Sequence, residues 1–195
     1  MHSMSESRLA NTVPNGRLIY VIGASGSGKD SLITYARCAL KADHLCCFAH
    51  RYITRAANSG GENHVELSEL EFEQRVKQGF FSMWWKSNGH LYGVGLEIDY
   101  WLEKGVTVIV NGSRAYLSEA IKRYPSLQPL LIDVDPEVLR DRLIKRGRET
   151  PHEIDQRVDR AMQYTNFDHL LISRIENNRS LEYAGDKILK FIVGE

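Results

Sequence analysis

The sequence lacks the apolar run of about 20 residues that a membrane-spanning helix requires. It also lacks an excess of positive charge, because 25 lysines and arginines are balanced by 25 aspartates and glutamates. A broad basic surface for nucleic acid is therefore excluded, and any anion site has to be a local cluster of cations. The three cysteines form no C-x-x-C pair, and the seven histidines show no metal-ligand spacing. These absences predict a cytoplasmic protein with reduced thiols that binds neither a membrane nor nucleic acid.

What the sequence does contain is enough apolar residues for one folded domain. The chain has 195 residues, of which 43% are hydrophobic, a share typical of globular proteins. The first 15 residues are polar and have no apolar core of a signal peptide. We predict a disordered leader over residues 1–16 and a single domain over residues 17–195.

Short apolar runs alternate with helical patterns, which is typical of a parallel sheet covered by helices. The predicted fold class is α/β, with a five-stranded parallel sheet flanked by helices. Asp135 before Pro136, and Thr150 three residues before Glu153, predict the starts of two helices. The expected strands cover residues 17–22, 45–50, 106–111, 130–134 and 170–173, and the expected helices cover about 30–40, 136–146, 151–164 and 180–192.

Residues 51–96 differ from this pattern, because their apolar runs are shorter and are interrupted by glycines and polar residues. Ser68 and Glu71 form a capping box that predicts a helix ending near Gly79. We interpret this stretch as an insertion into the α/β core, with an aromatic wall of its own. A second polar and basic segment, residues 145–157, is a candidate lid. The aromatic residues of the insertion are Phe80, Phe81, Trp84, Trp85 and Tyr92.

The stretch from Gly23 to Lys29 fits the phosphate-loop pattern G-x-x-x-x-G-K, with a strand predicted before it and a helix after it. Glycines allow several backbone N–H groups to point at one phosphate, and the helix N-terminus adds partial positive charge. Lys29 can reach the β- and γ-phosphates. The sequence therefore predicts an ATP site. Its candidate residues are Gly23, Ala24, Ser25, Gly26, Ser27, Gly28, Lys29, Asp30 and Ser31.

One position departs from the phosphate-loop pattern. After the lysine the pattern has a serine or threonine whose hydroxyl ligates Mg²⁺, whereas this chain has Asp30 followed by Ser31. Asp30 could ligate Mg²⁺ through its carboxylate, which is a hard oxygen ligand. It could instead favour the positive N-terminus of the following helix. The sequence leaves both interpretations open.

With these features, residues 17–193 resemble the guanylate kinase family of nucleoside monophosphate kinases. The resemblance rests on the phosphate loop, on the string from Tyr52 to Arg55, and on an ungapped match over residues 79–94. It implies a P-loop NTPase fold with an acceptor-binding insertion at about 51–96 and a lid at about 145–157. It further implies that Arg55 and Tyr92 hold the phosphate of the acceptor. The lid-like match comprises Arg146, Gly147, Arg148, Glu153, Ile154 and Arg157.

The residues that recognise guanine in that family are missing here. The family's serine falls on Arg51, its glutamate on Met83, and its aspartate on or beside Asn111 and Gly112. The family's second phosphate-binding arginine falls on Asn58. A base-reading pocket needs paired polar groups, and a thioether accepts hydrogen bonds only weakly. We therefore expect an acceptor without guanine and with more negative charge.

A closer resemblance is to ribose 1,5-bisphosphate phosphokinases of bacterial phosphonate breakdown. It rests on the strings HRYITR, GGENH, YGVGLEID, VNGSRAYL and GKDSL, and loops of that family also carry aspartate after the lysine. The resemblance implies a phosphorylated sugar, ribose 1,5-bisphosphate, as the acceptor, ATP and Mg²⁺ as cofactors, and 5-phosphoribosyl 1-diphosphate as the product. A guanylate kinase, another small-molecule phosphate kinase, and a non-catalytic binding module are the alternatives.

Several polar residues are candidates for holding the acceptor. Arg51 and Arg55 offer the bidentate geometry that suits phosphate. Arg114 follows a strand at the ligand end of the sheet and could hold the sugar phosphate or form a surface ion pair. Asn111 and Ser113 are candidates for the ribose hydroxyls. Tyr92 and His64 complete the set, whereas Trp84 and Trp85 are expected to pack.

Catalysis is expected to depend on Lys29 and the lid arginines Arg146, Arg148 and Arg157, which would neutralise the transferring phosphoryl group. The nucleophile is a phosphate oxygen that is already ionised at pH 7. We therefore predict that no side chain acts as a general base. Asp30 is the candidate metal ligand, and support from Asp133 is possible.

Overall fold

The main sheet of the computed structural model has five parallel strands in the order β2-β7-β1-β8-β9. The structure describes residues 16–42, 44–57, 62–163 and 171–195. The leader up to residue 15, Asn58 and residue 170 lie outside them. The five-stranded parallel sheet predicted from the sequence is confirmed. Its strands are β1 (Leu18–Gly23), β2 (Cys46–Phe48), β7 (Thr107–Asn111), β8 (Gln128–Asp133) and β9 (Ser173–Glu176).

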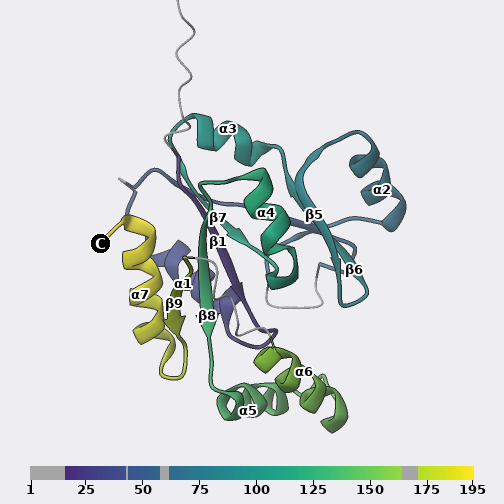
Figure 1. Ribbon diagram of the computed structural model, residues 1–195, viewed down its shortest axis with the longest axis vertical. Coiled ribbons are helices and arrows are strands. Elements are labelled where there is room, and N and C mark those ends of the chain that lie inside the picture. The colour runs from purple at the N-terminus through teal and green to yellow at the C-terminus, as the bar shows by residue number, and fades with distance from the viewer. Residues whose placement is uncertain (1–15, 43, 58–61, 164–170) are drawn as a thin grey trace, which may run out of the picture.

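The alternating residues of β1 explain how helices cover both faces of this sheet. Leu18, Tyr20 and Ile22 point to the face covered by α3 (Glu97–Glu103) and α4 (Leu117–Arg123). Ile19 and Val21 point to the opposite face, which is covered by α1 (Lys29–Ala39) and α7 (Leu181–Val193). Figure 1 shows these helices on the two sides of the sheet. Burial on both faces accounts for the continuous apolar run in the sequence.

A second sheet of four strands forms from residues 51–95, in the order β4-β3-β6-β5. β5 (Phe81–Ser87) and β6 (His90–Gly95) are an antiparallel hairpin, and its turn residues Asn88 and Gly89 have φ angles of 46° and 78°. Two positive φ angles are what a two-residue hairpin turn requires. The other strands are β3 (Arg51–Ile53) and β4 (Val65–Glu66), and α2 (Glu69–Lys77) begins at the predicted cap Ser68.

Two helices, α5 (Pro136–Arg146) and α6 (Pro151–Gln163), lie next to each other beyond the carboxyl end of β8 (Figure 1). The predicted capping box at the start of α6 is confirmed: Glu153 N–H donates to Thr150 Oγ1 at 3.3 Å, and Thr150 N–H donates to Glu153 Oε2 at 2.8 Å. Asp135 is the N-cap of α5 by position, but its side chain makes no capping hydrogen bond.

Three strands differ from their predicted bounds by two residues or more, among them β8, which begins at Gln128 instead of residue 130. The fifth strand begins at Ser173 instead of residue 170, and the second strand is reduced to Cys46–Phe48. Leu171 is fully exposed, whereas Ile172 packs against the core without belonging to the strand. α3 and α4 were not predicted, because neither has a side-chain cap that would mark its start. Among the described residues, no helix is long and apolar enough to cross a membrane.

Candidate active site

A cleft of about 970 Å³ opens at the carboxyl ends of the parallel strands, between the two sheets and the helices α5 and α6. Ligands of open α/β sheets bind at this end of the strands. Most of the residues predicted from the sequence line it, although they come from widely separated parts of the chain. They are Gly23, Ser25, Gly26, Gly28, Lys29, Asp30, Ser31, Arg51, Arg55, Tyr92, Ser113, Arg114, Arg146, Arg148 and Arg157.

The phosphate loop joins β1 to α1 through two glycines with positive φ angles, 95° at Gly26 and 89° at Gly28. These angles belong to the left-handed region, which other residues enter only with strain. Lys29 Nζ donates to the carbonyl oxygens of Gly23 and Ala24, both at 3.0 Å. The pKa of Lys29 is lowered to about 8; burial is the largest cause, Asp30 opposes it, and the cations of Arg51 and Arg114 act in the same direction as burial.

Two residues that the sequence did not reveal support the phosphate loop through hydrogen bonds. Asn177 Nδ2 donates to the carbonyl oxygen of Ser27 at 2.8 Å, and Arg142 Nη2 donates to the carbonyl oxygen of Asn177 at 2.7 Å. Asn177 follows β9 with no surrounding pattern that could have marked it. Arg142 precedes Arg146 by one helical turn, and that i,i+4 spacing is the signal that could have found it.

Asp30, which lines the cleft, is in contact with Asn111, which lies behind the cleft wall. Asn111, the last residue of β7, donates from Nδ2 to Asp30 Oδ1 at 2.5 Å. Asn111 is 8% exposed and does not line the cleft. Its predicted contact with ribose hydroxyls therefore needs correction, because its amide is directed at Asp30. The next residue, Gly112, lies against the ring of Tyr20. A Cβ atom at position 112 would be only 2.3 Å from that ring.

The acceptor end of the cleft is built around a carboxylate that the sequence analysis missed. Glu62 receives two hydrogen bonds from Arg51, through Nε and Nη2 at 2.5 Å each, and a third from Arg55 Nη2 at 3.2 Å. The side chains of Arg51 and Glu62 are only 11% and 10% exposed. The Arg51 guanidinium also lies 5.2 Å from the ring centre of Tyr92. Arg51 and Arg55 are therefore held in place by one buried anion.

His64, a candidate from the sequence, does not line the cleft. It is 7% exposed, and its two ring nitrogens lie 3.1 Å and 3.0 Å from the carbonyl oxygens of Glu62 and Arg55. Its role is to fix the backbone that carries the ion pairs. Trp85 packs as expected, stacked on Tyr92 with ring centres 5.7 Å apart, whereas Trp84 is 45% exposed.

In the lid, as at Glu62, one buried glutamate pairs with two arginines. Glu149, whose side chain is 6% exposed, pairs with Arg146 and with Arg157, the latter at 3.4 Å. Arg157 Nη1 also donates to Ser25 Oγ in the phosphate loop at 2.8 Å. Glu149 lies between the two predicted arginines in sequence, but nothing in the pattern indicated that it bridges them.

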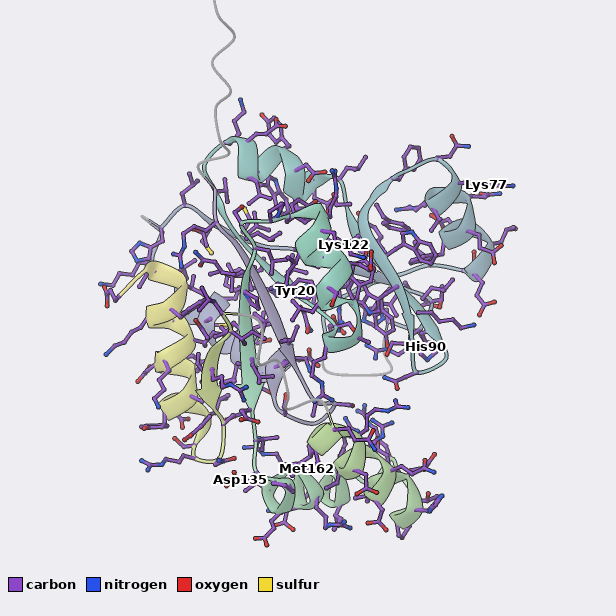
Figure 2. All side chains as sticks on the ribbon, in the orientation of Figure 1. Tyr20, Lys77, His90, Lys122, Asp135 and Met162 are labelled. Carbon is purple, nitrogen blue, oxygen red and sulfur yellow. The ribbon has the colours of Figure 1, made fainter. Side chains whose placement is uncertain are left out.

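Helix α6 also reaches the acceptor side of the cleft. Arg160 Nη1 donates to Asn88 Oδ1 in the β5–β6 turn at 3.5 Å, and Arg114 Nη1 donates to the carbonyl oxygen of Ala161 at 3.2 Å. Figure 2 shows Met162 on this helix and Tyr20 in the centre of the molecule above it. The lid helix therefore touches the phosphate loop, the acceptor sheet and the end of the main sheet at once.

Two residues weighed in the sequence lie away from the cleft. Met83 is 1% exposed and packs in the core beneath the second sheet. Asp133 does not line the cleft, and its Oδ2 lies 3.7 Å from Arg174 Nη1. Among the described residues, no group of three or more histidine, cysteine, aspartate or glutamate side chains forms a metal cage. A metal here would depend on few protein ligands, as Mg²⁺ beside phosphates usually does.

The parallel sheet, the phosphate loop and the arginine-lined cleft define a P-loop kinase with an acceptor sheet and a lid. Among solved structures, a guanylate kinase from Anaplasma phagocytophilum shares the fold, with a TM-score of 0.67 and 17% identity over 91% of this chain and 84% of that one. No protein-family model matches the sequence.

Curated relatives identify the family. The ribose 1,5-bisphosphate phosphokinase PhnN of Thiobacillus denitrificans is 50% identical over 177 residues, 91% of this chain and 93% of that protein. The protein of the same name from Psychromonas ingrahamii is 45% identical over 97% of this chain and 96% of its own length. The chain belongs to the ribose 1,5-bisphosphate phosphokinase family. It is a phosphotransferase, and membership implies a nucleotide and a small phosphorylated molecule as its substrates.

Proposed function

We propose that this protein transfers the γ-phosphoryl group of ATP to ribose 1,5-bisphosphate and forms 5-phosphoribosyl 1-diphosphate in phosphonate degradation. The observation that carries the proposal is a cleft with a phosphate loop at one end and the paired arginines Arg51 and Arg55 at the other. The names of relatives 45–50% identical over nearly the whole chain support the same acceptor. The donor, the metal and the individual residue roles given below are part of this proposal.

At the donor end, the loop around Lys29 would cradle the β- and γ-phosphates of ATP. The ammonium group has to leave the carbonyl oxygens of Gly23 and Ala24 to follow the phosphoryl group. Arg146 and Arg157 would approach the same group from the lid, and Arg148 also lines the cleft. These cations stabilise charge that develops as the phosphoryl group leaves ADP.

Asp30 fits a magnesium ion at the donor end. Its carboxylate is exposed in the cleft wall one residue after Lys29, at the position where P-loop kinases place a metal ligand. A carboxylate oxygen is the hard ligand that Mg²⁺ prefers. When bound, Mg²⁺ would neutralise the β- and γ-phosphate oxygens of ATP.

At the acceptor end, Arg51 and Arg55 retain donors for phosphate even though Glu62 engages both. Arg51 uses two of its five N–H groups on Glu62, which leaves its Nη1 edge for an acceptor. Arg55 Nε is buried without a hydrogen-bond partner among the described residues. An unsatisfied buried donor is costly, and a bound phosphate would satisfy it. Tyr92, Ser113 and Arg114 line the same region.

Phosphoryl transfer between these ends requires no protein base. The attacking oxygen belongs to a phosphate of the acceptor and is already ionised at neutral pH. Glu62, the buried carboxylate at this end, is engaged by Arg51 and Arg55. The protein contributes alignment of the two phosphates and neutralisation of their repulsion.

Guanylate kinase activity, the alternative weighed above, has no support at the acceptor end. The likeness to a guanylate kinase at 17% identity concerns the fold alone. Met83, at the position of the base-reading glutamate, is in the core.

The experiment that tests the proposal is incubation of the protein with Mg-ATP and ribose 1,5-bisphosphate, with GMP as the competing acceptor. We expect ADP and 5-phosphoribosyl 1-diphosphate in equal amounts, detected by ion-exchange chromatography or ³¹P NMR. Faster phosphorylation of GMP, or ADP formation that does not depend on the sugar, would refute the assignment.

A further inference from the structure

The contact between Asp30 and Asn111 joins a charged and a neutral side chain at the proposed metal site. In P-loop enzymes a serine or threonine after the lysine and an aspartate elsewhere in the sheet hold the metal. Here the residue after Lys29 is the carboxylate, and the neutral side chain is Asn111, which ends β7, the strand paired with β1. The two side chains are joined by a hydrogen bond of 2.5 Å.

The orientation of the Asn111 amide is fixed by its neighbour. An ionised carboxylate only accepts hydrogen bonds, so the NH₂ group must face Asp30 and the amide oxygen must face away from it. That oxygen, Oδ1, is buried and has no hydrogen-bond partner among the described residues. Buried polar atoms are nearly always paired. Among the described residues, the side chain of Asn111 thus has one hydrogen-bond partner, the carboxylate of Asp30.

We propose that the charged and the neutral members of the metal site have exchanged places in this chain: Asp30 supplies the carboxylate from the phosphate loop, and Asn111 orients it from β7. Asn111 is a positioning residue that holds this carboxylate through the hydrogen bond donated by its Nδ2. This inference rests on the proposed function, because the metal accompanies the nucleotide. It replaces the ribose contact expected for Asn111 from the sequence.

The competing explanation is that Asp30 only stabilises the N-terminus of α1. Asp30 does lie in the first turn of that helix, and a carboxylate there is favourable. That role needs no partner on β7, so it gives no reason for the hydrogen bond from Asn111 to Asp30. The two explanations differ in whether nucleotide binding becomes metal-dependent through this pair.

The test is an isosteric exchange of the two side chains. The variants are Asp30→Asn, Asn111→Asp, the double variant that carries both changes, and Asp133→Asn as a matched control that removes a carboxylate from β8. The readout is the ratio of the ADP dissociation constants measured by calorimetry without and with Mn²⁺. This ratio reports the contribution of the metal without any turnover. Thermal denaturation of each variant shows whether it is folded.

We expect Asp30→Asn to reduce this ratio about tenfold or more, as loss of a ligand or of its orienting partner typically does. The double variant should recover most of the loss, because it restores one carboxylate and one amide with their hydrogen bond reversed. Asp133→Asn should leave the ratio unchanged. A double variant that folds but binds no better than Asp30→Asn would overturn the exchange, as would a normal ratio in Asp30→Asn.

Asn111→Asp provides a second test that does not depend on the double variant. Two carboxylates at this distance repel each other, so the metal-free variant should have a lower melting temperature, and Mn²⁺ with ADP should raise it more than in the wild type. Equal shifts in the two proteins would overturn the inference. Failure of the sugar kinase assay would refute the proposed function and leave these binding results intact, so the two failures are distinguishable.

Discussion

Nucleotide affinity should fall as the pH rises through about 8, because the charge on Lys29 is lost there. Burial lowers the pKa of this lysine from 10.5 to about 8 in the nucleotide-free protein. Bound phosphates favour the charged form and raise the pKa again. The protein therefore binds ATP or ADP best with Lys29 protonated, and the affinity is fully present only below pH 8.

The magnitude follows from the fraction of Lys29 that is protonated. With a pKa of about 8, this fraction is about 90% at pH 7 and about 10% at pH 9. The dissociation constant of ADP should therefore rise about tenfold over these two pH units. The stability of the nucleotide-free protein should respond in the opposite direction. Between pH 8 and 10.5 the unfolded chain binds more protons at Lys29 than the folded chain, so this group makes folding more favourable as pH rises.

Calorimetric titration with ADP at several pH values from 7 to 9 measures the effect, and Lys29→Arg is the control. A guanidinium stays charged throughout this range, so the variant should bind more weakly but show no fall in affinity near pH 8. A wild-type dissociation constant that stays within about twofold from pH 7 to 9 would refute the reasoning. A fall of equal size in Lys29→Arg would assign the titration to another group.

Three further predictions concern the acceptor end, the lid and the core. Arg51→Ser should lower kcat/KM for ribose 1,5-bisphosphate about ten- to hundred-fold by removing a charge-assisted contact, and the loss should be smaller for a mono-phosphorylated acceptor; equal losses would contradict a role in reading the second phosphate. Glu149→Gln should lower the free energy of unfolding by about 1–3 kcal/mol, measured in urea, because two arginines lose a buried partner; an unchanged midpoint would rule out that pairing. Gly112→Ala should cost about 1–3 kcal/mol because its Cβ would meet the Tyr20 ring, and Tyr20→Leu in the same chain should recover part of it.

The strands and the phosphate loop could be predicted from the sequence because each depends on neighbours in the chain. The apolar run of β1 and the glycines before Lys29 carry their own signal, and Thr150 with Glu153 marks a helix start. Ser68 likewise marks the start of α2, because its side chain accepts a hydrogen bond from Glu71 N–H. Local patterns of this kind are set by hydrogen bonds that span three or four residues.

The contacts that orient Arg51 and Asp30 could not be predicted, because their partners are distant in the sequence. Glu62 pairs with Arg51 across eleven residues, and Asn111 contacts Asp30 across 81. A charged residue in a polar stretch is ordinarily solvated, so nothing local distinguishes Glu62 from the many exposed glutamates. The sequence makes Asn111 only a candidate for the ribose hydroxyls, because its place at the end of a strand indicates the cleft but not the direction of its side chain.

The second sheet has a consequence for how such an enzyme can change its substrate over evolutionary time. All four of its strands come from one uninterrupted stretch, residues 51–95, which leaves the main sheet after β2 and returns to it through α3. The end of the cleft around the phosphate loop, by contrast, draws on β1, α1, α5 and α6. In the proposed function, Arg51, Arg55 and Tyr92 all come from this one stretch, and Ser113 and Arg114 join them from the end of the main sheet. Most of the proposed acceptor site can therefore change by substitution within a single stretch while the phosphate loop stays intact.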